Sequence, residues 1–165
     1  MIKKINIQIL SIFKIGYSRY APGTVASFIT CLFYIFLFSF NVDIKILILF
    51  VSITFVYSVI AIDKMSKFFL EVDAKEIVID EFVGQSIPLL TMYYMLPQNN
   101  FGDFLIYSLI SLFLFRIFDI LKPFPINLID KKMKNGFGVM FDDIIAGFYS
   151  VLILLIFFIS INNYV

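Results

Sequence analysis

The chain has 165 residues, of which 61% are hydrophobic and 15% are charged, and its mean hydropathy is +0.98. Soluble domains carry about 45–50% apolar and about 25% charged residues, so this composition indicates a membrane protein and excludes an ordinary soluble domain. The net charge of +1 gives no sign of a nucleic-acid partner, and the absence of histidine excludes imidazole as base, nucleophile or metal ligand.

The N-terminal segment combines a short apolar stretch with Lys3, Lys4 and Lys14. Asn6 and Gln8 interrupt the apolar stretch, and no small-residue cleavage site follows it, so a signal peptide is excluded. We expect a retained segment that lies on the membrane surface with its lysines among the headgroups.

Four apolar runs are long enough to form membrane helices, near the lower limit of about 17–25 residues for a span. They are residues 24–40, 46–62, 104–121 and 144–161. A fifth run, Phe82 to Leu96, is shorter and contains Pro88, so its composition allows a span, a re-entrant segment or an interfacial helix. The single cysteine, Cys31, lies in the first run, which excludes a disulfide framework and a thiolate metal cluster.

The distribution of basic residues favours a fifth span. With five spans and the N-terminus inside, only Lys45 lies outside the cell. The cytoplasmic segments then carry Lys3, Lys4, Lys14, Arg19, Lys64, Lys67, Lys75, Lys122, Lys131, Lys132 and Lys134. Without the fifth crossing, the last of these lysines would move to the opposite side, against the positive-inside rule. We therefore predict an all-α, compact polytopic membrane bundle, one domain over residues 1–165, with about five membrane helices and an outside C-terminus.

This topology brings three polar segments to the cytoplasmic side. In the first, Pro22-Gly23 predicts a turn and Thr24 a helix cap, which leaves backbone N–H groups facing an anion; the alternative is an ordinary capped turn. In the second, Asp73, Glu76 and Asp80 share one face if the segment is helical. A divalent cation or a basic partner would relieve their repulsion, and the alternative is a solvated acidic face.

Glu81 follows Asp80 and points about 100° away from it on a regular helix. It would reach the same site only if the helix is irregular there or packs against the site.

The third polar segment begins at the end of the run that contains Arg116 and Asp119. These two residues are three apart and can pair on one helical face, either as a structural ion pair or as part of a site. Pro123 and Pro125 end that helix just after Lys122.

Further along this segment, residues 135–138 read Asn-Gly-Phe-Gly and predict a flexible turn whose N–H groups can bind an anion. Asp142 and Asp143 then precede the last span, where they can cap the helix or, opposite Asp80 and Glu81, form a metal site.

Four motifs, PGTVAS, DAKEIVIDEFVGQ, FRIFDILKPFPI and GFGVMFDDIIAG, occur in this order between Gly16 and Gly147. Together they resemble the phosphatidylglycerophosphatase A family. The chain departs from the family pattern at Ala26 and Asn135, where glycine is usual, and at Phe124, where tryptophan is usual. Alanine stays small, asparagine tolerates left-handed backbone and phenylalanine stays aromatic.

The resemblance implies a magnesium-dependent phosphatase of the bacterial inner membrane, which hydrolyses phosphatidylglycerophosphate to phosphatidylglycerol and phosphate on the cytoplasmic side. It assigns Mg²⁺ coordination or water activation to Asp80, Glu81, Asp142 and Asp143, and a further ligand or orienting role to Asp119. Phosphate binding falls to Arg116 and Lys122, with Gly136, Gly138 and Thr24 as additional donors.

Several alternatives stay open at this level. The nucleophile is either metal-bound water or an aspartate, and water is favoured because the DxDx[TV] motif of aspartate-nucleophile phosphatases is absent. A small transporter or ion-coupled carrier is the competing class, although the charges gather on one face and no repeat is present. A CDP-alcohol phosphotransferase is a second enzyme alternative, but the chain lacks the spaced Asp-Gly and Ala-Arg signature of that class. Acyl-chain preference, metal count and oligomeric state are not determined.

Overall fold

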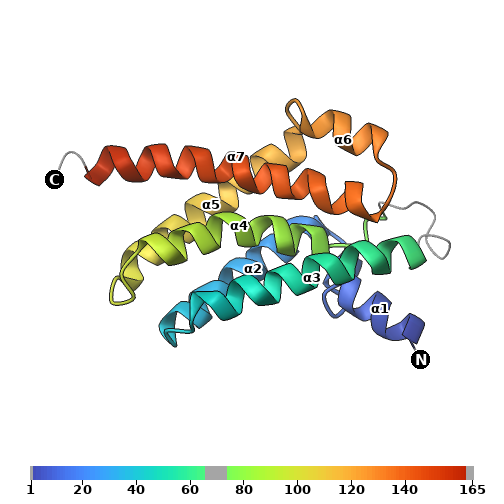
Figure 1. Ribbon diagram of the computed structural model, residues 1–165, viewed down its shortest axis with the longest axis horizontal. Coiled ribbons are helices and arrows are strands. Elements are labelled where there is room, and N and C mark those ends of the chain that lie inside the picture. Colours follow the sequence, from blue (N-terminus) through green and yellow to red (C-terminus); the bar gives the residue numbers. More distant parts are fainter. Residues whose placement is uncertain (1, 66–73, 163–165) are drawn as a thin grey trace.

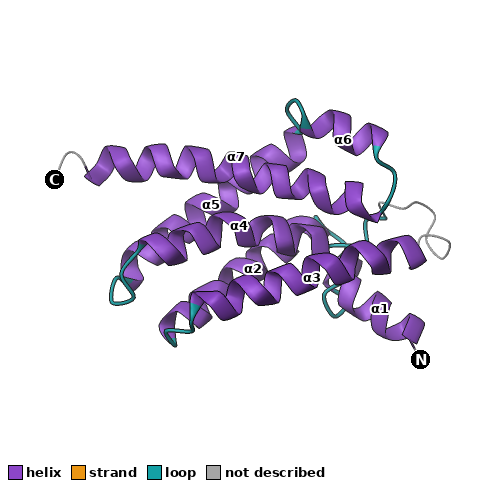
Figure 2. Ribbon diagram, viewed as in Figure 1, coloured by secondary structure: helices purple, strands orange, loops and turns teal. Residues whose placement is uncertain are grey.

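The computed structural model describes residues 2–65 and 74–162, and every regular element in these ranges is helical (Figures 1 and 2). The elements are α1 (Ile2–Leu10), a 3-10 turn η1 (Ile15–Tyr17), α2 (Pro22–Ser39), α3 (Ile44–Met65), α4 (Ile79–Met95), α5 (Phe101–Leu121), α6 (Ile126–Lys132) and α7 (Gly136–Asn162). The all-α prediction is confirmed, and Lys67 of the charge argument lies outside the described residues.

Five long helices lie side by side, and α4 is at their centre, packed against α2, α3, α5 and α7 (Figure 1). Four of them, α2, α3, α5 and α7, have the length and apolar composition of membrane spans. The fifth, α4, has 17 residues and contains Pro88. Pro88 is buried, so the missing backbone hydrogen bond of this helix is shielded by its neighbours. Four membrane spans are therefore supported by length and composition, and α4 is a shorter fifth helix of the bundle.

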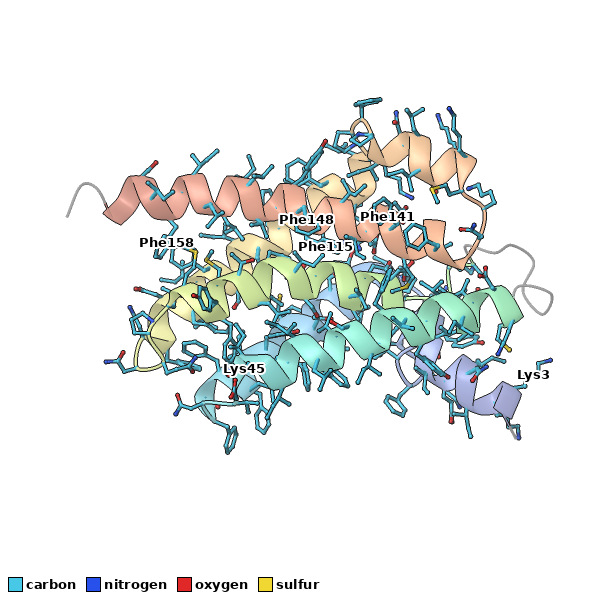
Figure 3. All side chains as sticks on the ribbon, in the orientation of Figure 1. Lys3, Lys45, Phe115, Phe141, Phe148 and Phe158 are labelled. Carbon is cyan, nitrogen blue, oxygen red and sulfur yellow. The ribbon has the colours of Figure 1, made fainter. Side chains whose placement is uncertain are left out.

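The polar loops collect at one end of the bundle. The end of α3, the starts of α2 and α4 and the α5–α7 connection lie toward that end, while the α2–α3 and α4–α5 connections lie at the other (Figure 1). Lys3 and Lys45 are likewise near opposite ends (Figure 3). Large apolar side chains such as Phe36, Leu49 and Ile156 are exposed along the helices between them, as lipid contact requires.

The N-terminal segment forms α1, which packs against α3. The hydroxyl of Tyr57 donates to Asn6 Oδ1 at 2.8 Å, and the N–H of Val78 donates to the carbonyl oxygen of Leu10 at 3.0 Å. Leu10 is fully buried. These contacts fix the segment just before α4 against the N-terminal helix.

Local signals explain where the helices begin and end. Pro22 occupies the first position of α2, where its missing N–H costs nothing. The prediction that Thr24 caps this helix is wrong, because the cap position is Ala21 and makes no side-chain cap. At the end of α5, Lys122 adopts a left-handed backbone with φ 42° and Pro123 follows, so the helix stops as predicted.

Helix α7 begins at Gly136, earlier than the sequence indicated. The N–H of Gly136 donates to Asp63 Oδ1 on α3 at 2.6 Å, and the N–H of Gly138 donates to Asn135 Oδ1 at 2.8 Å. These N–H groups therefore anchor the start of α7. The alternative that Asp142 and Asp143 cap the last helix is also wrong, because both lie within it.

Two glycines bring the backbones of α4 and α7 close together. A Cβ on Gly147 would lie 2.5 Å from the Gly84 carbonyl oxygen, and a Cβ on Gly84 would lie 2.7 Å from the Asp143 carbonyl oxygen. Small residues allow such close approach of membrane helices. Gly84 and Gly147 lie one turn from Asp80 and Asp143 respectively, so this contact sets the distance between the two carboxylates.

Candidate active site

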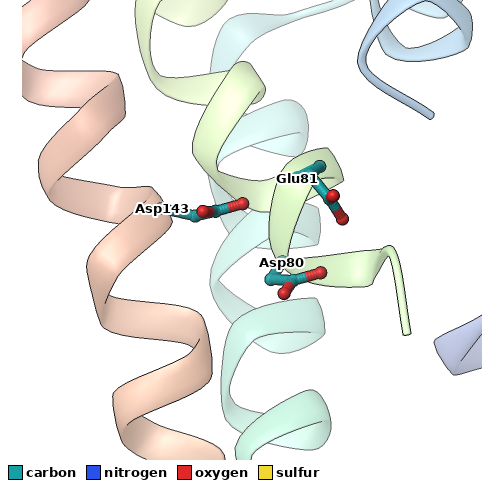
Figure 4. Close-up of side chains that lie close together, drawn as sticks. All are labelled: Asp80, Glu81 and Asp143. Atoms are coloured by element: carbon teal, nitrogen blue, oxygen red, sulfur yellow. The ribbon is translucent and has the colours of Figure 1, made fainter. Parts of the chain in front are cut away.

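Three carboxylates meet between α4 and α7 at the polar end of the bundle. Asp80 and Glu81 come from the first turn of α4, and Asp143 faces them from α7 (Figure 4). One oxygen of each lies within 4.8 Å of one oxygen of each of the others. Asp80 and Asp143 are buried, at 7% and 4% exposure. We refer to Asp80, Glu81 and Asp143 as the acidic cluster.

The position at a helix start explains how two consecutive residues reach one site. Val78, which precedes α4, has a non-helical backbone, and both carboxylates project from the helix end. The prediction of one acidic helical face through Glu76 and Asp80 is wrong, because residues 74–77 form a turn and α4 starts at Ile79. Asp73, the third member of that face, lies outside the described residues.

The carboxylates of the acidic cluster repel one another, and a nearby positive charge would relieve this repulsion. Two like charges about 4 Å apart repel by about 4 kcal/mol at an effective dielectric constant of about 20. Glu81 Oε2 and Asp143 Oδ2 are buried without a hydrogen-bond partner. The N-terminus of α4 also favours negative charge here. Buried carboxylate oxygens in this arrangement fit a hard divalent cation, so the cluster can hold a metal ion.

Arg116 on α5 borders this cluster. Its Nη1 lies 2.6 Å from Asp119 Oδ2, one turn away, and 3.8 Å from Glu81 Oε1. The Arg116 side chain is 16% exposed, and its Nε is buried without a hydrogen-bond partner. Asp119 therefore holds the guanidinium beside the acidic cluster, and the Nε–H of Arg116 remains available as a hydrogen-bond donor.

Lys122 forms a second group of charges at this end of the bundle. Its Nζ lies 2.8 Å from Asp142 Oδ2 and 3.1 Å from Asp130 Oδ1, and Lys134 Nζ lies 3.7 Å from the same Asp130 oxygen. We refer to Lys122, Asp130, Lys134 and Asp142 as the Lys122 network. Asp142 thus pairs with lysine, whereas the neighbouring Asp143 joins the carboxylates.

Two members of the Lys122 network, Lys122 and Asp130, hold each other in their charged forms. Burial alone would lower the pKa of Lys122, but the hydrogen bonds and charges of Asp142 and Asp130 outweigh burial and raise that pKa above its ordinary value. Burial would likewise raise the pKa of Asp130, but Lys122 and Lys134 lower it below its ordinary value. Lys122 therefore remains a cation in any physiological setting.

Both groups open into one cavity of about 320 Å³. Its lining comprises Pro22, Lys75, Ile77, Asp80, Glu81, Arg116, Asp119, Ile120, Lys122, Asp142 and Asp143. The structure thus gathers all five predicted acidic residues and both predicted basic residues around a single space. A cavity with two paired cations and a carboxylate cluster can bind a phosphate group together with a metal ion.

The remaining predicted residues lie outside this lining. Thr24 is exposed in the first turn of α2, while the N–H groups of Gly136 and Gly138 bond to Asp63 and Asn135. Sequence reasoning also missed two participants. Gly23 packs so closely that an added Cβ would collide with the Glu81 carboxylate, and Lys75 lines the cavity.

Both missed residues lie inside the recognised motifs. Only their tertiary contacts, and no feature of the motif, distinguish them from the other residues around them. The glycine of Pro22-Gly23 could be explained as a turn residue, and a lysine in a polar loop is ordinary.

A family profile described as phosphatidylglycerophosphatase A matches residues 8–158 of the chain. The chain is 44% identical over 81 residues to a phosphatidylglycerophosphatase A of Haemophilus influenzae, and 39% identical over 82 residues to one of Escherichia coli. These alignments cover 49% and 50% of the chain but only 45% and 43% of the relatives, so the chain spans less than half of their length.

A third relative aligns over a longer stretch. It is a protein of Bacteroides thetaiotaomicron named as a putative phosphatidylinositol-3-phosphatase, 33% identical over 142 residues, or 84% of each chain. No solved structure matches the chain. The names of these three relatives all specify removal of a phosphate from a lipid headgroup.

Proposed function

Because the chain belongs to the phosphatidylglycerophosphatase A family, we propose that it hydrolyses phosphatidylglycerophosphate to phosphatidylglycerol and inorganic phosphate, a step of phospholipid biosynthesis. The observation that carries this proposal is the cavity at one end of an apolar helix bundle, where the acidic cluster meets Arg116 and Lys122. A lipid embedded beside the bundle can present its phosphorylated headgroup to that cavity without leaving the membrane.

The proposed cofactor is Mg²⁺ held by Asp80, Glu81 and Asp143. Mg²⁺ prefers carboxylate oxygens and substrate phosphates as ligands, and it would supply charge neutralisation and activation of water. The burial of these carboxylates and the two unpartnered oxygens on Glu81 and Asp143 support this assignment. Asp142 has a different role in this proposal, because its carboxylate holds Lys122.

Arg116 and Lys122 are the proposed phosphate ligands. Arg116 can offer two parallel N–H donors to two phosphate oxygens, and Asp119 orients it. Lys122 adds a permanent positive charge that offsets the charge of the phosphoryl group as it is transferred to water. The bond from phosphorus to the headgroup oxygen breaks in this step, and the headgroup leaves as an alcohol after taking up a proton.

A second candidate substrate is phosphatidylinositol 3-phosphate, because the Bacteroides relative aligns over 84% of both chains. Purified protein is therefore tested for phosphate release from both lipids in detergent micelles, with Mg²⁺, with excess EDTA, and after Mg²⁺ is restored. We expect faster release from phosphatidylglycerophosphate, loss of release in EDTA and recovery with Mg²⁺. Full activity in EDTA would contradict the metal assignment, and faster release from the inositol lipid would replace the proposed substrate.

The proposed location is the bacterial cytoplasmic membrane, with the cavity on the cytoplasmic side. The excess of lysine at the polar end of the bundle supports this orientation. In a Cys31→Ser background, a cysteine at Asn100 should react with an impermeant thiol reagent in intact spheroplasts. A cysteine at Lys132 should react only after the membrane is opened, and its labelling from outside would contradict the cytoplasmic orientation.

A further inference from the structure

Lys75 lines the cavity but has no part in the chemistry described so far. It is exposed, and it occupies the turn in which the N–H of Ile77 donates to the Ala74 carbonyl oxygen at 2.8 Å. The next residue, Val78, is tied to Leu10 by a backbone hydrogen bond of 3.0 Å. The base of Lys75 is therefore held in place while its ammonium group remains accessible to water.

Lys75 differs from the other two cations of the cavity in its partners. Arg116 is paired with Asp119, and Lys122 is paired with Asp130 and Asp142. Within residues 2–65 and 74–162, Lys75 takes part in no ion pair. An incoming anion can therefore bind Lys75 without displacing a carboxylate of these described residues.

The cavity has room for two anionic groups at different depths, one beside the buried carboxylates and one beside the exposed Lys75. The carboxylates Asp80 and Asp143 are buried at its inner end, whereas Lys75 is exposed at its edge. A phosphomonoester that is to be hydrolysed must reach the inner end, where the acidic cluster lies. Any second anionic group of the same molecule then remains nearer the edge.

We propose that Lys75 binds the phosphodiester of the lipid substrate while the terminal phosphomonoester occupies the inner end of the cavity. This inference rests on the proposed function and specifies its substrate class: glycerophospholipids that carry both a phosphodiester and a phosphomonoester. Phosphatidylglycerophosphate and phosphatidylinositol 3-phosphate have both groups. Phosphatidic acid has only the phosphomonoester, so Lys75 contributes nothing to its binding.

The test compares Lys75→Gln, Lys75→Arg and the unchanged protein in mixed micelles. We expect Lys75→Gln to raise KM for phosphatidylglycerophosphate about five- to tenfold with kcat within about twofold, because a contact made equally in ground and transition states changes KM alone. Lys75→Arg should restore KM. The inhibition constant of phosphatidic acid against phosphatidylglycerophosphate should be the same in all three proteins.

Lys132→Gln is the matched control, since Lys132 is an exposed lysine of α6 that does not line the cavity. Lys132→Gln should leave unchanged both the KM for phosphatidylglycerophosphate and the inhibition constant of phosphatidic acid. Three results would overturn the proposal: an unchanged KM in Lys75→Gln, an equal weakening of phosphatidic acid, or the same rise in KM in Lys132→Gln. Absence of phosphate release from every lipid by the unchanged protein would instead refute the proposed function itself.

Discussion

Asp142 and Asp143 are neighbours in one helix, yet they belong to two regions with opposite electrostatics. Asp142 is neutralised by Lys122 at 2.8 Å, whereas Asp143 lies among the carboxylates of the acidic cluster. The difference follows from helical geometry, because consecutive residues point about 100° apart and α7 packs against α4 as well as against α5 and α6. A pair of aspartates can therefore serve two functions.

The Lys122 network stabilises the fold, whereas the acidic cluster has the features of a ligand-binding site. The Lys122 network is internally satisfied, so it contributes to stability and holds a cation at the cavity. The acidic cluster is not satisfied by the protein alone, because Glu81 and Asp143 each keep a buried oxygen without a hydrogen-bond partner. Substitutions in the two regions should therefore have different signatures.

The largest effect is expected from Asp143→Asn. Removal of its charge weakens the proposed metal site, so turnover should fall about 100-fold or more while the melting temperature in detergent stays the same or rises, since a repulsion is removed. Asp142→Asn provides the contrast. It should lower the melting temperature, by the equivalent of about 1–3 kcal/mol, because it weakens a charged hydrogen bond to Lys122. Equal melting temperatures and equal turnover for the two variants would mean that the two regions are not distinct.

Gly23→Ala should have the next largest effect. The new Cβ collides with the Glu81 carboxylate, which is the flexible end of a side chain and can move away at low cost to folding. Displacement of a proposed metal ligand should lower turnover roughly 10- to 100-fold with a small change in melting temperature. Gly102→Ala is the control, because nothing lies within 4 Å of its added Cβ. Normal turnover in Gly23→Ala would show that the position of Glu81 is not critical.

Arg116→Lys tests the region between the two groups of charges. A lysine keeps the charge but cannot make two parallel hydrogen bonds to phosphate, so turnover should fall about tenfold. If Arg116 served only to pair with Asp119, Arg116→Lys would keep wild-type turnover, and Arg116→Ala would lose stability and activity together. Turnover and melting temperature of both variants distinguish these outcomes.

The smallest effect is expected from Lys134→Gln. Lys134 is 59% exposed and its ion pair with Asp130 spans 3.7 Å, and such surface pairs contribute about 0–1 kcal/mol. Turnover should stay within about twofold and the melting temperature nearly constant. A fall in melting temperature comparable to that of Asp142→Asn would mean that the whole Lys122 network, including its surface member, is needed to hold Lys122.

The sequence by itself determined the helical membrane class and most of each long helix. Continuous apolar runs have few stable states in lipid other than helices, so the predicted spans overlap α2, α3, α4, α5 and α7. The motifs also identified seven of the eight charged residues that line the cavity, and Lys75 is the exception. Local patterns placed two helix starts wrongly, at Pro22 and Gly136. The start of α2 follows a left-handed backbone at Ala21, and the start of α7 is fixed by a hydrogen bond to Asp63 on α3.

Tertiary structure alone decided how the charged residues divide. No spacing rule distinguishes Asp142 from Asp143, and only the packing of α7 between its neighbours gives one a lysine and the other two carboxylates. The close contact of Gly84 and Gly147 across α4 and α7 is equally invisible in sequence, yet it sets the separation of Asp80 and Asp143. Electrostatic energy depends on distances in space, and residues about 60 positions apart acquire those distances only when the helices pack.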